Sequence, residues 1–233
     1  MIKKTPFFSK HIQAGANMGN FFGFTLPIYY KGINVEHKHV RSSVGVFDVS
    51  HMGQLILEGE EVSDFLQKVT TNDISKIKTG SVQYSCMTNE KGMVLDDLLV
   101  YKLSEKKYML VVNASNSFKI LNWLNVNNVS SIVIKDITME RGLLAVQGPK
   151  AIDLLQNFTD FNLFDMKSYS FQILKLGGVD NILLSSTGYT GSGGFEIYGD
   201  KNDMLRIWDM LFSVSKFNVM PIGLGARDTL RLE

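Results

Sequence analysis

Two kinds of hydrophobic spacing alternate along the chain. Short runs of alternating or continuous apolar residues predict strands, and apolar residues three or four positions apart predict helices. From residue 47 onwards they predict the order strand, helix, three strands, helix, strand. The predicted elements are a strand at 47–57, a helix at 60–69, strands at 81–87, 93–103 and 107–112, a helix at 115–126 and a strand at 131–135.

A second round with the same order of elements follows. Its predicted elements are a strand at 142–146, a helix at 149–158 with Pro149 in its first turn, strands at 169–176, 181–187 and 194–198, and a helix at 201–215. The order differs from the strict βαβα alternation of a doubly wound parallel sheet. We therefore predict an α+β fold with mainly antiparallel sheets, built from two duplicated, interleaved lobes: residues 1–50 with 137–233, and residues 51–136.

Composition and charge narrow the function classes. With 233 residues, 45% hydrophobic and 20% charged, the chain can bury a full core. A formal net charge of +1, with no run of more than two Lys or Arg, argues against nucleic acid as a partner. No segment has the about eighteen apolar residues of a membrane span, and Pro6 follows the basic start where a signal peptide needs an apolar run. A single cysteine, Cys86, excludes an internal disulfide and a cysteine-based zinc site and fits a reducing compartment, so we expect a cytoplasmic protein.

An acidic pair, Asp96-Asp97, lies inside the predicted strand 93–103. Because side chains alternate across a strand, Asp96 shares a face with Leu98, whereas Asp97 shares the other face with Leu99. Both faces are apolar, so at least one carboxylate is expected to leave bulk water, which is costly unless it is paired, hydrogen-bonded or protonated. Such a position indicates chemistry or ligand binding. The alternative is that the pair lies at the open end of a hairpin and meets solvent or an arginine.

Two histidine-containing motifs do not support hydrolysis or metal binding. In a strand, Ser50 and His51 face opposite sides, whereas a catalytic triad needs a hydrogen bond between them. His37 and His39 lie in a predicted helix at 33–41, where residues two apart diverge by about 200° around the axis. The His-Glu-x-x-His spacing of zinc enzymes is absent from the sequence.

A glycine-rich loop, residues 186–196, separates two predicted strands. It lacks the Gly-Lys-Ser/Thr of a P-loop and the Gly-x-Gly-x-x-Gly of a dinucleotide site. Its glycines allow close approach to a ligand, Tyr189 offers a stacking face, and Glu196 is a second acid in an apolar strand. A plain hairpin loop is the alternative. Several polar-tipped residues on or near predicted strands are suited to lining a cavity for a flat heteroaromatic ligand: Tyr84, Tyr101, Asn113, Tyr169 and Tyr189. The alternative is that their polar ends lie at an ordinary rim and are solvated.

Six short segments form a further pattern. They are, in chain order, residues 21–27 (FFGFTLP), 45–53 (GVFDVSHMG), 91–97 (KGMVLDD), 145–149 (AVQGP), 186–196 (STGYTGSGGFE) and 225–233 (GARDTLRLE). In this order and spacing they resemble the aminomethyltransferase (T-protein) family of the glycine cleavage system, over nearly all of the chain. The resemblance implies the folate-binding fold of that family.

The resemblance also implies a function and a set of site residues. A family member would release ammonia from the aminomethyl group on the lipoyl arm of H-protein and pass the one-carbon unit to tetrahydrofolate, giving 5,10-methylenetetrahydrofolate. Lipoylated H-protein would be the partner and tetrahydrofolate the co-substrate, with no metal. The essential acid of the family falls at Asp96. Its folate contacts would fall at Tyr84, Asn113, Tyr169, Tyr189, Glu196 and Arg227.

The sequence departs from the family in two places. Phe24 stands where the family usually has tryptophan, a small loss of aromatic area that the core is expected to tolerate. The segment 223–233 begins a helix and stops without a cap, whereas the family continues into a β-barrel-like domain, so we expect that domain to be absent from this chain.

Two related functions are alternatives. One is another folate-dependent demethylase, of which the oxidative kinds carry fused flavin-binding sequence that this chain lacks. The other is a non-catalytic folate-binding protein of iron-sulfur cluster assembly, which resembles a Lys-Gly-Cys-Tyr signature. The corresponding stretch here is Ser-Thr-Gly-Tyr-Thr-Gly, without cysteine, and Asp96 is present, which favours the transferase.

Overall fold

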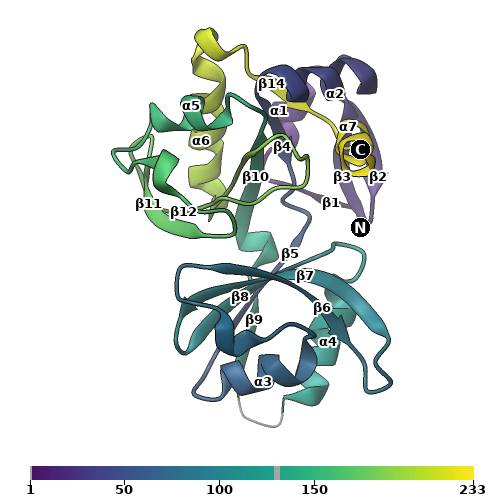
Figure 1. Ribbon diagram of the computed structural model, residues 1–233. Helices are drawn as coiled ribbons and strands as arrows, with labels where there is room; N and C mark the ends of the chain where they lie inside the picture. Colours follow the sequence, from purple (N-terminus) through teal and green to yellow (C-terminus); the bar gives the residue numbers. More distant parts are fainter. Residues whose placement is uncertain (1, 129–131) are drawn as a thin grey trace. The chain divides into compact units, whose positions relative to one another are not determined.

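The computed structural model describes residues 2–128 and 132–233, which divide into two compact units (Figure 1). The first unit contains the chain up to His51 and from Glu140 onwards, and the second unit is Met52–Met139. The predicted α+β class is confirmed. The strand predicted at 131–135 begins at a residue outside the described part, and the strand observed there is β9 (Val133–Asp136). None of the helices among the described residues is both long and apolar enough to cross a membrane.

The second unit is an antiparallel sheet with the strand order β6-β7-β8-β5-β9. Its other strands are β5 (Gly53–Glu58), β6 (Val82–Thr88), β7 (Val94–Ser104) and β8 (Lys107–Val112). Its helices are α3 (Val62–Val69), α4 (Ser117–Asn127) and the 3-10 helix η1 (Ile74–Lys76). Another 3-10 helix, η2 (Thr138–Glu140), includes the last two residues of this unit and the first residue of the segment that returns to the first unit. Alternate strand residues such as Leu98 and Leu110 pack with Phe65 of α3 and Leu124 of α4, so one face of the sheet is covered by both helices (Figure 1).

The first unit contains a larger sheet and a small one. The larger sheet has the order β11-β12-β13-β10-β4-β14, antiparallel except for the parallel pair β14 and β4, and the small sheet has the order β1-β3-β2. The strands are β1 (Lys3–Lys4), β2 (Asn17–Phe21), β3 (Phe24–Tyr29), β4 (Gly45–Asp48), β10 (Arg141–Gln147), β11 (Phe171–Leu176), β12 (Val179–Ser185), β13 (Gly194–Asp200) and β14 (Met220–Ile222). The helices are α1 (Phe8–Gln13), α2 (Ile33–Ser42), α5 (Ala151–Gln156), α6 (Lys201–Ser213), α7 (Leu224–Leu232) and the 3-10 helices η3 (Leu163–Asp165) and η4 (Ser215–Phe217).

The face of the larger sheet that carries the apolar core is set by strand alternation. Phe195 and Ile197 of β13 pack in one cluster with residues of α5 and α6. Glu196 and Tyr198, at the intervening positions, therefore point to the opposite face. Glu196, an acid in an otherwise apolar strand, thus lies on the face of the sheet away from α5 and α6.

The continuous strand predicted at 47–57 is wrong. The structure ends β4 at Asp48 and begins β5 at Gly53, in the other unit. The Asp48 carboxylate accepts the Ser50 N–H through Oδ1 at 2.9 Å, and such a local turn competes with strand pairing. The same carboxylate binds Thr5 and His11 through Oδ2, so it is held in the first unit.

The helix predicted at 149–158 is also too long. It is observed only over Ala151–Gln156, and Pro149 precedes the helix instead of occupying its first turn. The Asn157 side chain donates to the carbonyl oxygens of Asp153 and Leu154 at 2.5 and 3.1 Å, which satisfies the helix end and stops it there. The helix predicted at 201–215 likewise ends earlier, at Ser213, where η4 follows.

Candidate functional site

Asp96 lies on β7, on the face that packs against α3 and α4, and is 4% exposed. Its Oδ2 accepts the backbone N–H of Asn113 at 3.0 Å. Its Oδ1 accepts the side-chain amides of Asn113 and Asn116 at 2.9 and 2.6 Å. The carboxylate has therefore left bulk water and is satisfied by N–H groups, as a buried charge requires. The alternative of an acid facing solvent or an arginine is wrong for Asp96.

Asn116 is a residue that sequence reasoning missed. It immediately precedes α4, whereas the predicted helix at 115–126 placed it inside the helix. A short polar residue at the start of a helix was the available signal. The Asp96 carboxylate thus binds the residues that lead into the N-terminus of α4, where the helix dipole favours a negative charge.

Tyr84 and Asn113 converge on the same acidic pair. The hydroxyl of Tyr84, which is half exposed, donates to Oδ2 of Asp97 at 2.9 Å. The amide of Asn113 also donates to Oδ1 and to the backbone oxygen of Asp97, at 2.8 and 3.1 Å. The structure therefore brings together three of the predicted site residues in the second unit: Tyr84, Asp96 and Asn113.

Glu196 is the corresponding acid of the first unit and is 7% exposed. Its Oε2 accepts from the hydroxyl of Thr187, and from that of Tyr198 at 3.3 Å. Burial raises the pKa of the Glu196 carboxyl, against the opposing effects of these two hydroxyls and of the positive charge of Arg227. Glu196 is therefore a buried acid whose surroundings ease protonation.

Tyr189 and Arg227 form a stacked pair in the same unit. The guanidinium carbon of Arg227, on α7, lies 4.5 Å from the ring centroid of Tyr189, which is a cation–π distance. Arg227 is 7% exposed, and its Nε is buried without a hydrogen-bond partner among the described residues. A buried cation with an unused donor is suited to an anionic or acceptor-bearing ligand.

His51 lies close to this pair and was considered in the sequence only as a neighbour of Ser50. Its ring meets that of Phe21 edge-on at 5.4 Å. Burial, followed by the positive charge of Arg227, lowers the pKa of His51 to about 4, against the effect of Asp48. His51 is therefore a neutral imidazole near pH 7. Ser50 instead donates to the carbonyl oxygen of Leu143 at 3.2 Å, in keeping with the rejection of a triad.

The glycine-rich loop is tied to the neighbouring strand by Gln147. The Gln147 amide donates to the carbonyl oxygen of Thr187 at 3.3 Å and accepts from the Thr190 hydroxyl at 3.0 Å. Gly194 has φ of +140°, and a Cβ there would lie 2.4 Å from the backbone oxygen of Val146, so only glycine fits. The loop is thus a fixed platform for Tyr189.

Tyr169 contacts Ser186, the first residue of the glycine-rich loop. It has a left-handed φ of 57°, is 46% exposed, and its N–H donates to the carbonyl oxygen of Ser186 at 3.0 Å. The predicted site residues thus fall into two groups, one in each unit. Among the described residues, no group of three or more His, Cys, Asp or Glu side chains lies close enough to hold a metal ion.

Comparison with known proteins identifies similar chains over this whole region. The family model described as the GCVT N-terminal domain matches residues 7–233. An aminomethyltransferase of Flavobacterium psychrophilum is 48% identical over all of this chain and 65% of its own length. An aminomethyltransferase of Bacteroides fragilis is 49% identical over all of this chain and 64% of its own length.

Solved structures that resemble this chain include another aminomethyltransferase. The glycine cleavage system aminomethyltransferase T from Bartonella henselae matches with a TM-score of 0.90 and 32% identity, over all of this chain and 62% of its own. A heterotetrameric sarcosine oxidase from Corynebacterium matches with a TM-score of 0.63 at 13% identity, which shows a shared fold alone. The chain therefore spans somewhat less than two thirds of the length of the aminomethyltransferases that it matches.

Proposed function

The chain belongs to the GCVT N-terminal domain family, and we propose that it performs the aminomethyltransferase reaction of the glycine cleavage system. In this reaction the aminomethyl group on the lipoyl arm of H-protein loses ammonia. Its one-carbon unit passes to tetrahydrofolate, giving 5,10-methylenetetrahydrofolate. Lipoylated H-protein is the proposed partner, and tetrahydrofolate is the proposed co-substrate.

The observation that carries this proposal is the setting of Asp96. Its three hydrogen bonds all come from N–H groups, which can donate but not accept, so both oxygens of the carboxylate act as acceptors. As ammonia departs, the carbon that it leaves is still bonded to the lipoyl sulfur and becomes cationic. Attack by the folate amine and cleavage of the carbon–sulfur bond then complete the transfer and free the lipoyl thiol. A fixed, buried negative charge would stabilise that carbon and would orient the folate amine that attacks it.

The first-unit group is proposed to bind the folate. Glu196 would accept hydrogen bonds from the amino and ring nitrogens of the pterin. Its Oε1 receives neither of the hydroxyl contacts described above, which fall on Oε2. Arg227, with its unpartnered buried Nε, would anchor folate through its cationic fork, and Tyr189 would offer a stacking face.

Calorimetric binding of 5-formyltetrahydrofolate, a stable reduced folate, tests the folate part of the proposal. Wild-type chain is compared with Glu196→Ala and Asp96→Asn. We expect Glu196→Ala to weaken binding roughly 10- to 100-fold, the range for a lost hydrogen bond to a charged group. Asp96→Asn should leave affinity within about threefold, because its charge acts on the transfer step.

Three results would count against the proposal in different ways. Equal binding by wild type and Glu196→Ala would remove Glu196 from the site. Full ammonia release by Asp96→Asn, with aminomethyl-loaded H-protein, would remove the proposed role of Asp96. Absence of binding by a folded wild-type chain would mean that residues 1–233 do not bind folate by themselves, and repeating the titration with a full-length relative would show whether the remaining third completes the pocket.

A further inference from the structure

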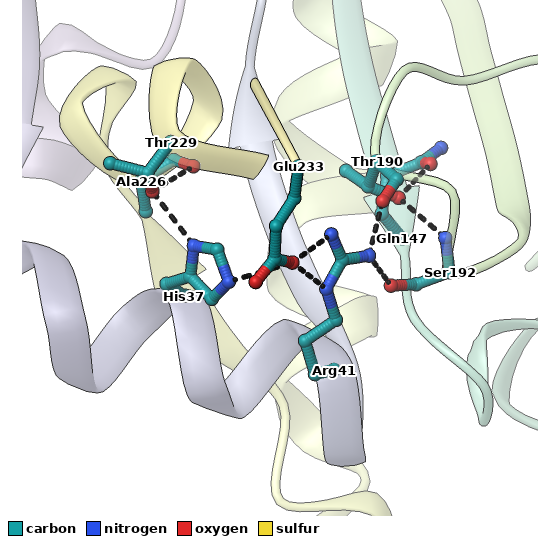
Figure 2. A network of polar contacts seen from close by, with 8 residues as sticks. All are labelled: His37, Arg41, Gln147, Thr190, Ser192, Ala226, Thr229 and Glu233. Atoms are coloured by element: carbon teal, nitrogen blue, oxygen red, sulfur yellow. Dashed lines mark hydrogen bonds and ion pairs between the residues drawn. The ribbon is translucent and has the colours of Figure 1, made fainter. Parts of the chain in front are cut away.

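Arg41, at the C-terminal end of α2, joins two segments of the first unit that lie far apart in the sequence (Figure 2). Its Nη1 donates to Oγ of Ser192 at 2.5 Å and to the backbone oxygen of Thr190. Its Nε and Nη2 donate to Oε2 of Glu233 at 2.9 and 2.6 Å. One edge of the guanidinium therefore holds the glycine-rich loop, and the other holds the residue that follows α7.

The Glu233 side of this contact is itself supported by α2 and α7. The ring of His37, one turn before Arg41, places Nε2 3.2 Å from Oε2 of Glu233. Its Nδ1 lies 2.8 Å from the hydroxyl of Thr229, which donates to the carbonyl oxygen of Ala226 at 3.1 Å. Figure 2 shows these side chains in one continuous network. The end of α7 is thus fixed against α2 by two side chains of α2.

The loop side of the contact is equally well defined. Thr190, whose carbonyl oxygen binds Arg41, also anchors its hydroxyl on Gln147, and the N–H of Ser192 donates back to that hydroxyl at 3.3 Å. Tyr189 directly precedes this anchored residue. A displacement of the loop from Arg41 would therefore move the Tyr189 ring.

Arg41 joins the same two elements that carry the stacked pair Tyr189 and Arg227. Tyr189 belongs to the loop and Arg227 to α7, and their stacking at 4.5 Å requires the two elements to keep a fixed separation. A planar guanidinium can donate from both edges at once, which an ammonium group cannot do. Arginine is therefore the side chain suited to hold both elements.

We propose that Arg41 is a positioning residue of the folate site, which holds the glycine-rich loop against α7 so that Tyr189 stays stacked on Arg227. This inference rests on the proposed folate function. Arg41 is not a catalytic residue, because its described contacts are with the loop backbone, Ser192 and Glu233. Its effect on the reaction passes through the order of the loop.

The proposal predicts a specific pattern for substitutions of Arg41. If Arg41→Gln leaves the loop in the binding-competent arrangement for about a tenth of the time, the apparent Kd for folate rises about tenfold. Arg41→Lys keeps the charge but places its donors on a single nitrogen instead of a planar fork that reaches both elements, so its effect should be intermediate. In the transfer reaction, KM for folate should rise while kcat at saturating folate stays within about twofold.

Two measurements on the same proteins test this. Amide hydrogen exchange of residues 186–194 in ligand-free protein reports the order of the loop, and calorimetry with 5-formyltetrahydrofolate reports affinity. Arg206→Gln is the matched control, because the ion pair that Arg206 forms with Asp203, at 3.6 Å, lies within α6, and the Arg206 side chain is 65% exposed. We expect faster exchange confined to the loop and weaker binding in Arg41→Gln, an intermediate result in Arg41→Lys, and wild-type behaviour in the control.

The outcomes separate this inference from the folate proposal. Unchanged loop exchange in Arg41→Gln would overturn the positioning role, and so would faster exchange with unchanged folate affinity. Should Arg41→Gln fail to fold, wild-type exchange and affinity in Arg41→Lys would also overturn it. If neither wild type nor a full-length relative binds folate, the folate proposal fails, and faster loop exchange in Arg41→Gln would still support the contact between Arg41 and the loop.

Discussion

Asp96 in the second unit and Glu196 in the first are both buried acids on β-strands, yet they have different neighbours. Asp96 is 4% exposed and Glu196 7% exposed. Three N–H groups donate to Asp96, from Asn113 and Asn116. Glu196 instead meets the hydroxyls of Thr187 and Tyr198. The two carboxyl groups are therefore similarly buried, but Asp96 is bound by N–H groups and Glu196 by hydroxyl groups.

The difference in partners assigns different tasks to the two acids. An amide N–H can only donate, so Asp96 is satisfied only as an acceptor, whereas a hydroxyl can donate to a carboxylate or accept from a carboxylic acid. Burial raises the pKa of Glu196, and its hydroxyl partners allow either form. Asp96 is thus suited to hold a fixed negative charge beside a developing cation, and Glu196 to exchange hydrogen bonds with a polar ring.

Removing the charge of Asp96 should give the largest effect. We expect Asp96→Asn to slow ammonia release from aminomethyl-loaded H-protein by about 10²–10³-fold, the range for loss of one electrostatic transition-state contact. Folate affinity should change little, and circular dichroism checks that the variant folds. An equally large loss of transfer in Glu196→Gln, with folate bound at saturation, would erase the distinction between the two acids.

Removing one N–H donor of Asp96 should give a smaller loss of the same kind. Asn116→Ala leaves the two donors from Asn113 in place, so the carboxylate stays buried but loses its shortest hydrogen bond, 2.6 Å long. We expect transfer at saturating folate to fall about tenfold, in line with one hydrogen bond to a charged group. Steady-state kinetics should show the loss in kcat. A loss confined to KM would place Asn116 among the binding residues instead.

The sequence identified the two acids but not their partners, for a physical reason. Alternation along a strand depends only on neighbouring residues, so the burial of Asp96 follows from Leu98, two positions away on the same face, whereas Glu196 was recognised as an acid between two apolar strand residues. Asn116 was missed because a shift of two residues in the start of α4 changes its place from inside the helix to its cap. Local sequence patterns thus predict on which face of a strand a side chain lies, whereas the exact ends of helices and strands determine which residues it contacts.

Local sequence patterns do not predict contacts between segments that lie far apart in the chain. Arg41 belongs to the helix that the sequence predicts at 33–41, and its partners lie about 150 and 190 positions away. The end of β4 depends on Asp48 binding Thr5 and His11, which precede it by 43 and 37 residues. The burial that lowers the pKa of His51 likewise involves Phe21. Such contacts follow from the tertiary fold.

The hydroxyl partners of Glu196 can be tested by a change that keeps the shape of the side chain. Thr187→Val removes a hydroxyl that lowers the pKa of Glu196, so that pKa should rise further. We expect folate affinity near pH 7 to fall roughly threefold to tenfold. The loss should grow as the pH decreases, because more of Glu196 is then protonated. Calorimetry at several pH values measures this. A pH-independent loss would mean that Glu196 binds folate equally well in both forms.

The smallest expected effect is a difference in how stability depends on pH. Since burial raises the pKa of Glu196 above the ordinary value of 4.5, folded protein holds this proton more tightly than unfolded protein. The stabilisation is complete below pH 4.5 and is lost as pH rises through the folded-state pKa. Glu196→Gln lacks this titration, so urea unfolding should show its stability rising relative to wild type above pH 4.5 and then levelling off.

Asp48 gives the opposite sign within the same unit. It is as deeply buried, yet its hydrogen bonds and charge interaction with His11, and its bonds to Ser50 and Thr5, outweigh burial and lower its pKa below 3.8. Its stabilisation is therefore present above pH 3.8 and is lost as pH falls through the lower folded-state value. Asp48→Asn should accordingly lose stability relative to wild type as pH rises through that range, where Glu196→Gln is level. Parallel curves for the two variants would show that burial alone controls both acids, and that the choice of hydrogen-bond partner does not.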